Sequence, residues 1–211
     1  MFRTKICGVT RESDVRAIAR AGADAIGFQM SLGPRKLTLA RARRLVKAVP
    51  SRLLCVGVFV DEPLSQVKKA VTYCGFDAVQ LHGRESADYC GALKVPVIKV
   101  IRMKGPNTFR VFRTYPVAAF LLDTYNKNVP GGTGKTFQTT WARKAVLGLP
   151  APVILAGGLT PENVQKAAER SGAFGVDVSS GVESGPGLKD PRKVSMFIRN
   201  ARKAFRPIQG N

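Results

Sequence analysis

The sequence predicts an α/β fold, a single-domain (β/α)8 TIM barrel that spans residues 1–211. The first observation is an alternation: eight short apolar runs are each followed by a stretch with the spacing of an amphipathic helix. The second is a repeated junction, in which a helix ends at Gly22, Gly75 or Gly172 and the next strand begins at once. A doubly wound sheet is the alternative, placed second because no dinucleotide-binding glycine pattern is present.

The elements follow from local signals. Strands are predicted at 4–7, 23–29, 53–60, 77–82, 97–101, 118–123, 152–156 and 174–179. Helices are predicted at 11–21, 39–49, 63–73, 86–93, 107–114, 141–147, 161–170 and 191–205. Pro63 suits the first turn of its helix. The run LLCVGVFV at 53–60 is nearly all apolar, as expected of a strand buried on both faces.

The charge is strongly positive, with 34 basic and 14 acidic side chains and a formal balance of +20. Such a charge attracts phosphates and polyanions. The basic residues are scattered, and the densest clusters, 41–44 and 199–206, fall within helical stretches. This pattern favours solvated helix faces over a nucleic-acid surface, so we expect no specific nucleic-acid partner.

Four cysteines and one histidine show no metal-ligand spacing, so no metal site is expected. The cysteines do not form the framework of a small secreted domain. A strand begins almost at Met1, without the apolar segment of a signal peptide, and no apolar run is long enough for a membrane span. We therefore expect a reducing, cytoplasmic environment.

The carboxyl ends of the strands carry the active site in barrels of this type. Here they offer Cys7, His82 and Asp123, with Arg35 in the loop after the second strand. The plainer alternative for Cys7 is a buried small hydrophobe, and for His82 it is a histidine bonded to its own loop. For Asp123 it is a turn-capping carboxylate, and for Arg35 it is a surface arginine. Their convergence on one face is the reason to predict an enzyme.

Cys7 lies two residues after Lys5 and on the same strand face, because side chains alternate along a strand. An ammonium in that position stabilises a thiolate. We therefore predict a lowered pKa for Cys7 and, for a carboxylic acid that donates a proton near neutrality, a raised pKa for Asp123. Asp177 is expected to balance the charge of Lys5 inside the barrel.

Two glycine-rich loops predict a phosphate site. Backbone N–H groups approach an anion closely after the seventh and eighth strands of such barrels, which here carry Gly157, Gly158, Ser179, Ser180 and Gly181. A small phosphorylated substrate is therefore expected. The segment 129–136 resembles a nucleotide P-loop but has valine where its first glycine belongs, and we interpret it as a mobile lid.

The amino-acid sequence also resembles that of one protein family from Lys5 to about Phe197. The matching segments are KICGVT, a G-P-R loop, VGVF, VQLHG-x-E, LLD followed by GGTGKTF, LAGGLTPENV, and GVDVSSGVE followed by PG-x-KD. These are similar to phosphoribosylanthranilate isomerase, an enzyme of tryptophan biosynthesis. The resemblance implies isomerisation of N-(5-phosphoribosyl)anthranilate to a carboxyphenylamino-deoxyribulose phosphate, without cofactor or metal, by a monomer or homodimer.

The resemblance also implies roles for single residues. Cys7 would be the general base, Asp123 the general acid, and Arg35 the partner of the anthranilate carboxylate. From its place at a strand end, and not from the resemblance, His82 is expected to contact substrate. Two departures stand out: the family usually has serine before Pro-Arg and an aromatic residue after it, where this chain has Gly33 and Lys36. A different phosphosugar isomerase or epimerase, or a basic nucleic-acid-binding protein, remains the alternative.

Overall fold

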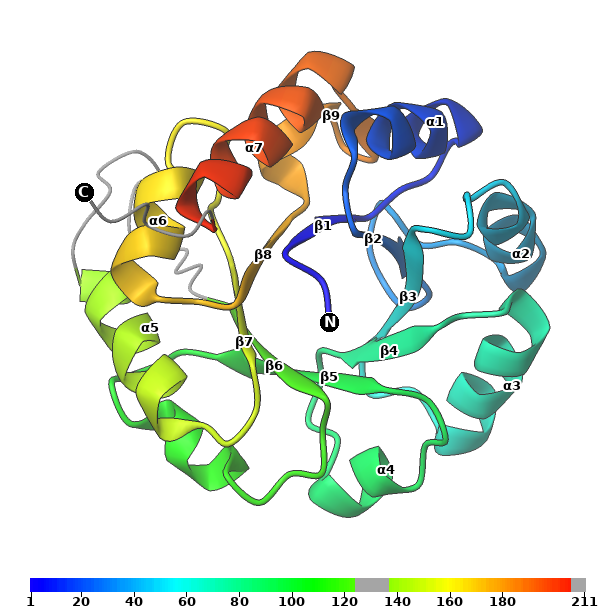
Figure 1. The fold of residues 1–211 in the computed structure, drawn as a ribbon. Helices are drawn as coiled ribbons and strands as arrows, with labels where there is room; N and C mark the ends of the chain where they lie inside the picture. Colours follow the sequence, from blue (N-terminus) through cyan, green and yellow to red (C-terminus); the bar gives the residue numbers. More distant parts are fainter. Residues whose placement is uncertain (124–136, 206–211) are drawn as a thin grey trace.

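Eight parallel strands close into a barrel in the computed structural model, which describes residues 1–123 and 137–205. The strands follow one another in chain order around the ring, and β8 pairs back with β1. Helices surround this ring on the outside (Figure 1). The predicted (β/α)8 TIM barrel is therefore confirmed.

The strands differ by no more than two residues at either end from those predicted. They are β1 (Thr4–Cys7), β2 (Ala25–Gln29), β3 (Leu54–Phe59), β4 (Ala78–Leu81), β5 (Val97–Arg102), β6 (Ala119–Asp123), β7 (Val153–Ala156) and β8 (Gly175–Val178). The α-helices are α1 (Glu12–Ala21), α2 (Leu39–Lys47), α3 (Leu64–Cys74), α4 (Ala87–Gly91), α5 (Phe137–Gly148), α6 (Val164–Ser171) and α7 (Pro191–Ala204).

Helix ends shift by up to four residues, the largest shift being the start of α5 at Phe137 rather than 141, and three further details depart from the predicted elements. The predicted helix at 107–114 is a short 3-10 helix, η1 (Thr108–Phe112). A small antiparallel pair, β9 (Glu183–Gly185) and β10 (Leu188–Lys189), follows the 3-10 turn η2 (Ser180–Val182) after β8. Pro63 precedes α3 as its N-cap residue rather than lying in its first turn.

Alternation along each strand separates two apolar layers. Ile98, Val100 and Leu121 belong to a cluster inside the barrel, which Phe2 joins from the N-terminal side. The intervening residues of the same strands, such as Ile101, pack outward with the helices. The side chain of a strand's last residue is thereby assigned to the barrel mouth or to the helical layer.

The barrel interior also contains a buried cation. The ammonium of Lys5 lies 2.9 Å from a carboxylate oxygen of Asp177 on the neighbouring strand, and donates across the barrel to Gln80 at 2.9 Å. Burial alone would lower the pKa of Lys5, but the charges of Asp177 and Cys7 outweigh burial and raise it. Lys5 is therefore held as a cation, as the predicted role of Asp177 requires.

No helix within the described parts of the chain is long and apolar enough to cross a membrane.

Replacing Asp177 with asparagine would leave the Lys5 ammonium buried without a counter-charge. Breaking a buried pair in this way costs about 3–5 kcal/mol of unfolding free energy. Urea unfolding should show that loss, whereas Glu12→Gln, which breaks the exposed contact with Arg44, should change stability far less. A loss below about 1 kcal/mol for Asp177→Asn would mean that water reaches the ammonium.

Candidate active site

Three of the predicted site residues meet at the carboxyl end of the barrel. Cys7 is the last residue of β1, Asp123 is the last residue of β6, and His82 directly follows β4. Their positions continue the inward-facing alternation of these strands. A thiol, a carboxyl group and an imidazole therefore face the same opening.

Cys7 fits because β2 carries a glycine beside it. A Cβ atom on Gly27 would lie 2.8 Å from the Cys7 sulfur and 3.1 Å from the Lys5 side chain. Burial raises the pKa of the Cys7 thiol, although Lys5 and Lys189 oppose that effect. The predicted lowering of this pKa is therefore wrong: Lys5 has the expected position, but loss of water around the sulfur outweighs its charge.

His82 has a protein partner at the mouth. Its Nε2 atom lies 3.3 Å from a carboxylate oxygen of Asp123, and both side chains are about one quarter exposed, at 25% and 23%. On its backbone side, the His82 carbonyl accepts a hydrogen bond from Arg102 at 3.2 Å. The imidazole and the carboxyl group thus form a pair that a ligand can still reach.

Arg35 reaches the mouth by crossing the loop after β1. Gly8 has φ of +76°, and a Cβ atom there would collide with the Arg35 side chain. The Arg35 guanidinium donates to both carboxylate oxygens of Glu183, from Nε at 2.8 Å and from Nη2 at 2.6 Å. Such a bidentate pair fixes the plane of the guanidinium, so Arg35 is preoriented but partly neutralised.

Glu183 also binds a buried lysine. The Lys189 ammonium lies 2.7 Å from the carboxylate and donates to the Ser179 carbonyl at 3.0 Å. Burial alone would raise the pKa of Glu183, but the hydrogen bonds from Arg35 and Lys189 outweigh it and lower the pKa. Burial lowers the pKa of Lys189 despite that carboxylate. This cluster connects the loop after β2 with the loop after β8.

The two glycine-rich loops predicted to hold phosphate lie in contact. Gly157 and Gly158 have φ of +84° and +68°, and a Cβ atom on Gly158 would meet no atom within 4 Å. A Cβ atom on Gly181 would collide with the carbonyl of Leu159, so the loop after β8 packs directly on the loop after β7. Ser180, at the start of η2, is exposed.

Ser179 carries a polar atom that needs a partner. Its hydroxyl is buried and makes no hydrogen bond within the described residues. That oxygen lies 3.0 Å from where a Cβ atom on Gly8 would stand, so it faces the loop that Arg35 crosses. Buried hydroxyls are normally hydrogen-bonded, which makes this atom a candidate ligand contact.

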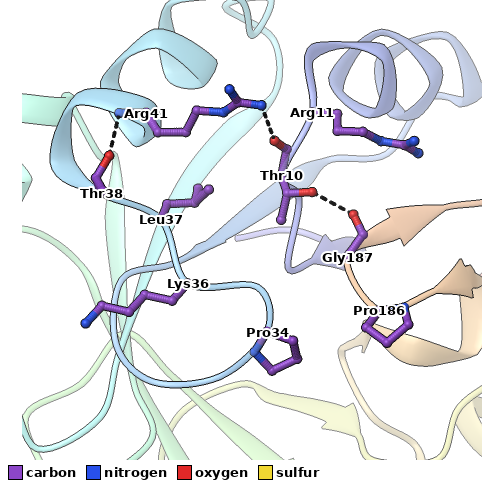
Figure 2. Close-up of a pocket in the computed structure, with 9 residues that line it drawn as sticks. All are labelled: Thr10, Arg11, Pro34, Lys36, Leu37, Thr38, Arg41, Pro186 and Gly187. Atoms are coloured by element: carbon purple, nitrogen blue, oxygen red, sulfur yellow. Dashed lines mark hydrogen bonds between the residues drawn. The ribbon is translucent and has the colours of Figure 1, made fainter.

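A pocket of about 450 Å³ opens beside this cluster (Figure 2). Its walls include Pro34, Leu37 and Pro186. Thr10 donates to the Gly187 carbonyl at 2.6 Å and closes one side. None of the predicted site residues lines it. This lateral pocket is therefore separate from the mouth where Cys7 and Asp123 lie.

Several site residues were not predicted from the sequence. Glu183 and Lys189 stand within the last matching segment, so their presence in a family motif was an available signal. Arg102 follows the inward alternation of β5, which was predicted one residue too short. The predicted lid at 129–136 lies outside the described residues. Within the described residues, no group of three or more histidine, cysteine, aspartate and glutamate side chains could hold a metal ion.

The raised pKa of Cys7 has a direct chemical readout. At pH 7 the thiol should react with iodoacetamide more slowly than an unshifted cysteine, and labelling should accelerate only above the ordinary titration range of a thiol. Peptide mass spectrometry separates Cys7 from Cys90, whose pKa burial raises to about 11, and which serves as the internal control. Half-maximal labelling of Cys7 below pH 8 would contradict the dominance of burial.

The lowered pKa of Glu183 predicts a pH-dependent contribution to stability. Because the pKa is lower in the folded chain, the contribution is complete above the unfolded value of about 4.3 and is lost as the pH falls through the folded value. Urea unfolding of wild type and Glu183→Gln should therefore differ by a constant amount from about pH 6 upward, and converge below about pH 4. A difference that grows in acid would contradict the network.

The comparisons with known proteins agree on one family. Residues 4–200 match the family model of N-(5'-phosphoribosyl)anthranilate isomerase. The isomerase of Desulforudis audaxviator is 44% identical, and the match covers 97% of this chain and 100% of that protein.

Two solved structures have the same fold. One is a phosphoribosylanthranilate isomerase in complex with reduced 1-(o-carboxyphenylamino)-1-deoxyribulose 5-phosphate, with TM-score 0.84 and 33% identity over 96% of this chain and 100% of that one. The other is a monomer generated from the dimeric isomerase of Thermotoga maritima, with TM-score 0.83 and 34% identity over the same shares of the chains. The chain therefore belongs to the phosphoribosylanthranilate isomerase family.

Proposed function

We propose that this protein converts N-(5-phospho-β-D-ribosyl)anthranilate into 1-(2-carboxyphenylamino)-1-deoxy-D-ribulose 5-phosphate, an Amadori rearrangement of tryptophan biosynthesis. The observation that carries the proposal is the convergence of Cys7 and Asp123 at one barrel mouth, in a chain of this family. The reaction needs one group that gives a proton and one that takes a proton. These two side chains have that chemistry.

Asp123 is the general acid in this proposal. Its protonated carboxyl group gives a proton to the ring oxygen of the ribose, and the bond between that oxygen and C1 breaks. The lone pair of the anilino nitrogen forms the C=N bond of a Schiff base. Asp123 is left as a carboxylate, and His82, 3.3 Å away, is placed to donate a hydrogen bond to it.

Cys7 is the general base. Its thiolate removes the C2 proton, which the adjacent C=N bond acidifies, and the resulting enolamine tautomerises to the ketone. The raised pKa leaves little thiolate in the empty site but makes that thiolate a stronger base. A proton then returns from the thiol to Asp123 through solvent, which restores both groups for the next turnover.

Substrate binding is proposed to use the two ends of the mouth. The glycine-rich loops at 157–158 and 179–181 would hold the phosphate through backbone N–H groups, and the unpartnered Ser179 hydroxyl supports a ligand there. Arg35 would bind the anthranilate carboxylate. Because Glu183 already occupies Nε and one Nη2 hydrogen, the Nη1 side of the guanidinium is the edge offered to substrate.

The domain organisation, the oligomeric state and the cellular location are also part of this proposal. We propose one domain for residues 1–211, which acts as a monomer or homodimer on a small phosphorylated substrate. A cytoplasmic location is supported by the four cysteines, which are buried and unpaired.

Turnover of freshly prepared phosphoribosylanthranilate tests the proposal, followed as loss of substrate fluorescence. Cys7→Ser and Asp123→Asn should each lower kcat by about 10²–10⁴-fold, the usual contribution of a positioned acid or base. Lys68→Met, on the exposed face of α3, is the matched control and should retain activity.

The outcomes separate the activity from its mechanism. A folded wild type without turnover would reject the proposed substrate and favour another phosphosugar. Wild-type turnover with unimpaired Cys7→Ser or Asp123→Asn would keep the reaction and reject that residue's role.

A further inference from the structure

Glu183 and Lys189 face each other across the small antiparallel pair that follows β8. The two residues are register partners in β9 and β10, and the Lys189 ammonium lies 2.7 Å from the Glu183 carboxylate. Both side chains are buried, with exposed fractions of 5% for Glu183 and 0% for Lys189. The backbone N–H of Lys189 donates to Asp14 at 3.4 Å, and its ammonium donates to the Ser179 carbonyl at 3.0 Å. Contacts at both ends of the side chain therefore hold Lys189 in place.

The Glu183 carboxylate is shared between two cations. Arg35 donates to both of its oxygens, at 2.8 Å from Nε and at 2.6 Å from Nη2. Lys189 donates to the same oxygen as Arg35 Nε. One negative charge therefore lies between two positive charges. A carboxylate opposite Arg35 alone would cancel the charge of the guanidinium at a distance, whereas the three groups together keep one positive charge.

The carboxylates of two neighbouring elements do not balance this remaining charge, because each has a cation of its own. Asp14 of α1, which accepts from the Lys189 backbone, also accepts from Nε and Nη2 of Arg11 at 3.1 Å and 2.8 Å. Asp177 of β8 lies 2.9 Å from the Lys5 ammonium. The excess positive charge of the cluster therefore remains available to an anion that reaches Arg35.

We propose that Lys189 is a positioning residue for carboxylate recognition: it neutralises Glu183, so that Glu183 holds the plane of Arg35 without cancelling the charge that Arg35 offers to substrate. The proposal rests on the function proposed above, in which Arg35 binds the anthranilate carboxylate. Because its side chain is fully buried, Lys189 acts through Glu183 rather than by contact with the ligand. Glu183 supplies the orientation, and Lys189 supplies the compensating charge.

Removing the Lys189 charge should weaken the binding of a ligand that carries a carboxylate at this end. In Lys189→Gln the remaining pair of Arg35 and Glu183 is formally neutral, so its attraction for an anion falls. Adding Glu183→Gln removes the negative charge as well and restores one positive charge. The second substitution should therefore repair the first. If Lys189 and Glu183 only supported the loops, the two losses would accumulate instead.

The experiment measures the equilibrium binding of two ligands by isothermal titration calorimetry. One is reduced 1-(o-carboxyphenylamino)-1-deoxyribulose 5-phosphate, with which a relative was solved, and the other is the same compound without the carboxylate. Both ligands carry the phosphate, so effects on the phosphate loops through Ser179 cancel in the ratio of the two Kd values. Binding is measured rather than turnover because the charge of Lys189 also acts on the Cys7 thiol.

Lys189→Gln should lower the preference for the carboxylate ligand about five- to tenfold, as expected when one charge close to a partly buried anion is lost. The double variant Lys189→Gln/Glu183→Gln should return to within about threefold of the wild-type preference. Lys193→Gln is the matched control, because it removes the same charge from an exposed lysine that donates to the Glu183 backbone carbonyl at 2.9 Å. It should change the preference less than about twofold.

The outcomes separate this inference from the proposed function. An unchanged preference in a folded Lys189→Gln, or a double variant with no more preference than Lys189→Gln, would overturn the role of Lys189 alone. If Lys189→Gln does not fold, the step from Glu183→Gln to the double variant removes the same charge and should lower the preference by a similar factor. A wild type without the preference, or an Arg35→Gln variant that keeps it, would reject the proposed carboxylate contact and this inference with it.

Discussion

The buried pair of Lys5 and Asp177 is the constraint on which the site depends. An ammonium inside a barrel is costly unless a counter-charge and hydrogen-bond acceptors surround it. Asp177 and Gln80 supply both from β8 and β4. Because Cys7 stands one inward position above Lys5, the same contacts that hold the cation also fix the strand that carries the thiol. Gly27 completes the arrangement, since a side chain there would displace both residues.

The chemistry at the mouth follows from a competition between burial and charge. Three cations influence Cys7, since Lys5 and Lys189 lower its pKa and Arg35 interacts with it, but loss of water dominates. Glu183 shows the opposite result, because two direct hydrogen bonds from cations outweigh burial. The difference lies in direct contact: a bonded cation stabilises an anion far more effectively than one farther away.

The fold was predictable because it rests on local periodicity. Apolar runs that alternate with glycine-ended helices predicted the position of every strand of the barrel. Because Cys7 and Asp123 stand at the ends of two predicted strands, their position at one mouth could then be predicted as well. The pairing of Arg35 with Glu183 was not predictable in this way, because 148 positions separate the two residues. The predicted lowering of the Cys7 pKa was wrong for a related reason. The sequence shows Lys5 two residues away, but it does not show how completely the packing of the folded chain excludes water from the sulfur.

The compensated cations in and around the barrel have a consequence for how a ligand arrives. Lys5, Arg35, Lys189 and Lys99 each contact a carboxylate, from Asp177, Glu183, Glu183 and Glu85 respectively. The formal excess of +20 is therefore carried largely by the outer surface. A field of that kind acts over distance and is screened by salt within about 10 Å at 0.1 M. Ionic strength should thus govern the frequency of productive encounters with an anionic metabolite more strongly than it affects the buried ion pairs of Lys5 and Lys189.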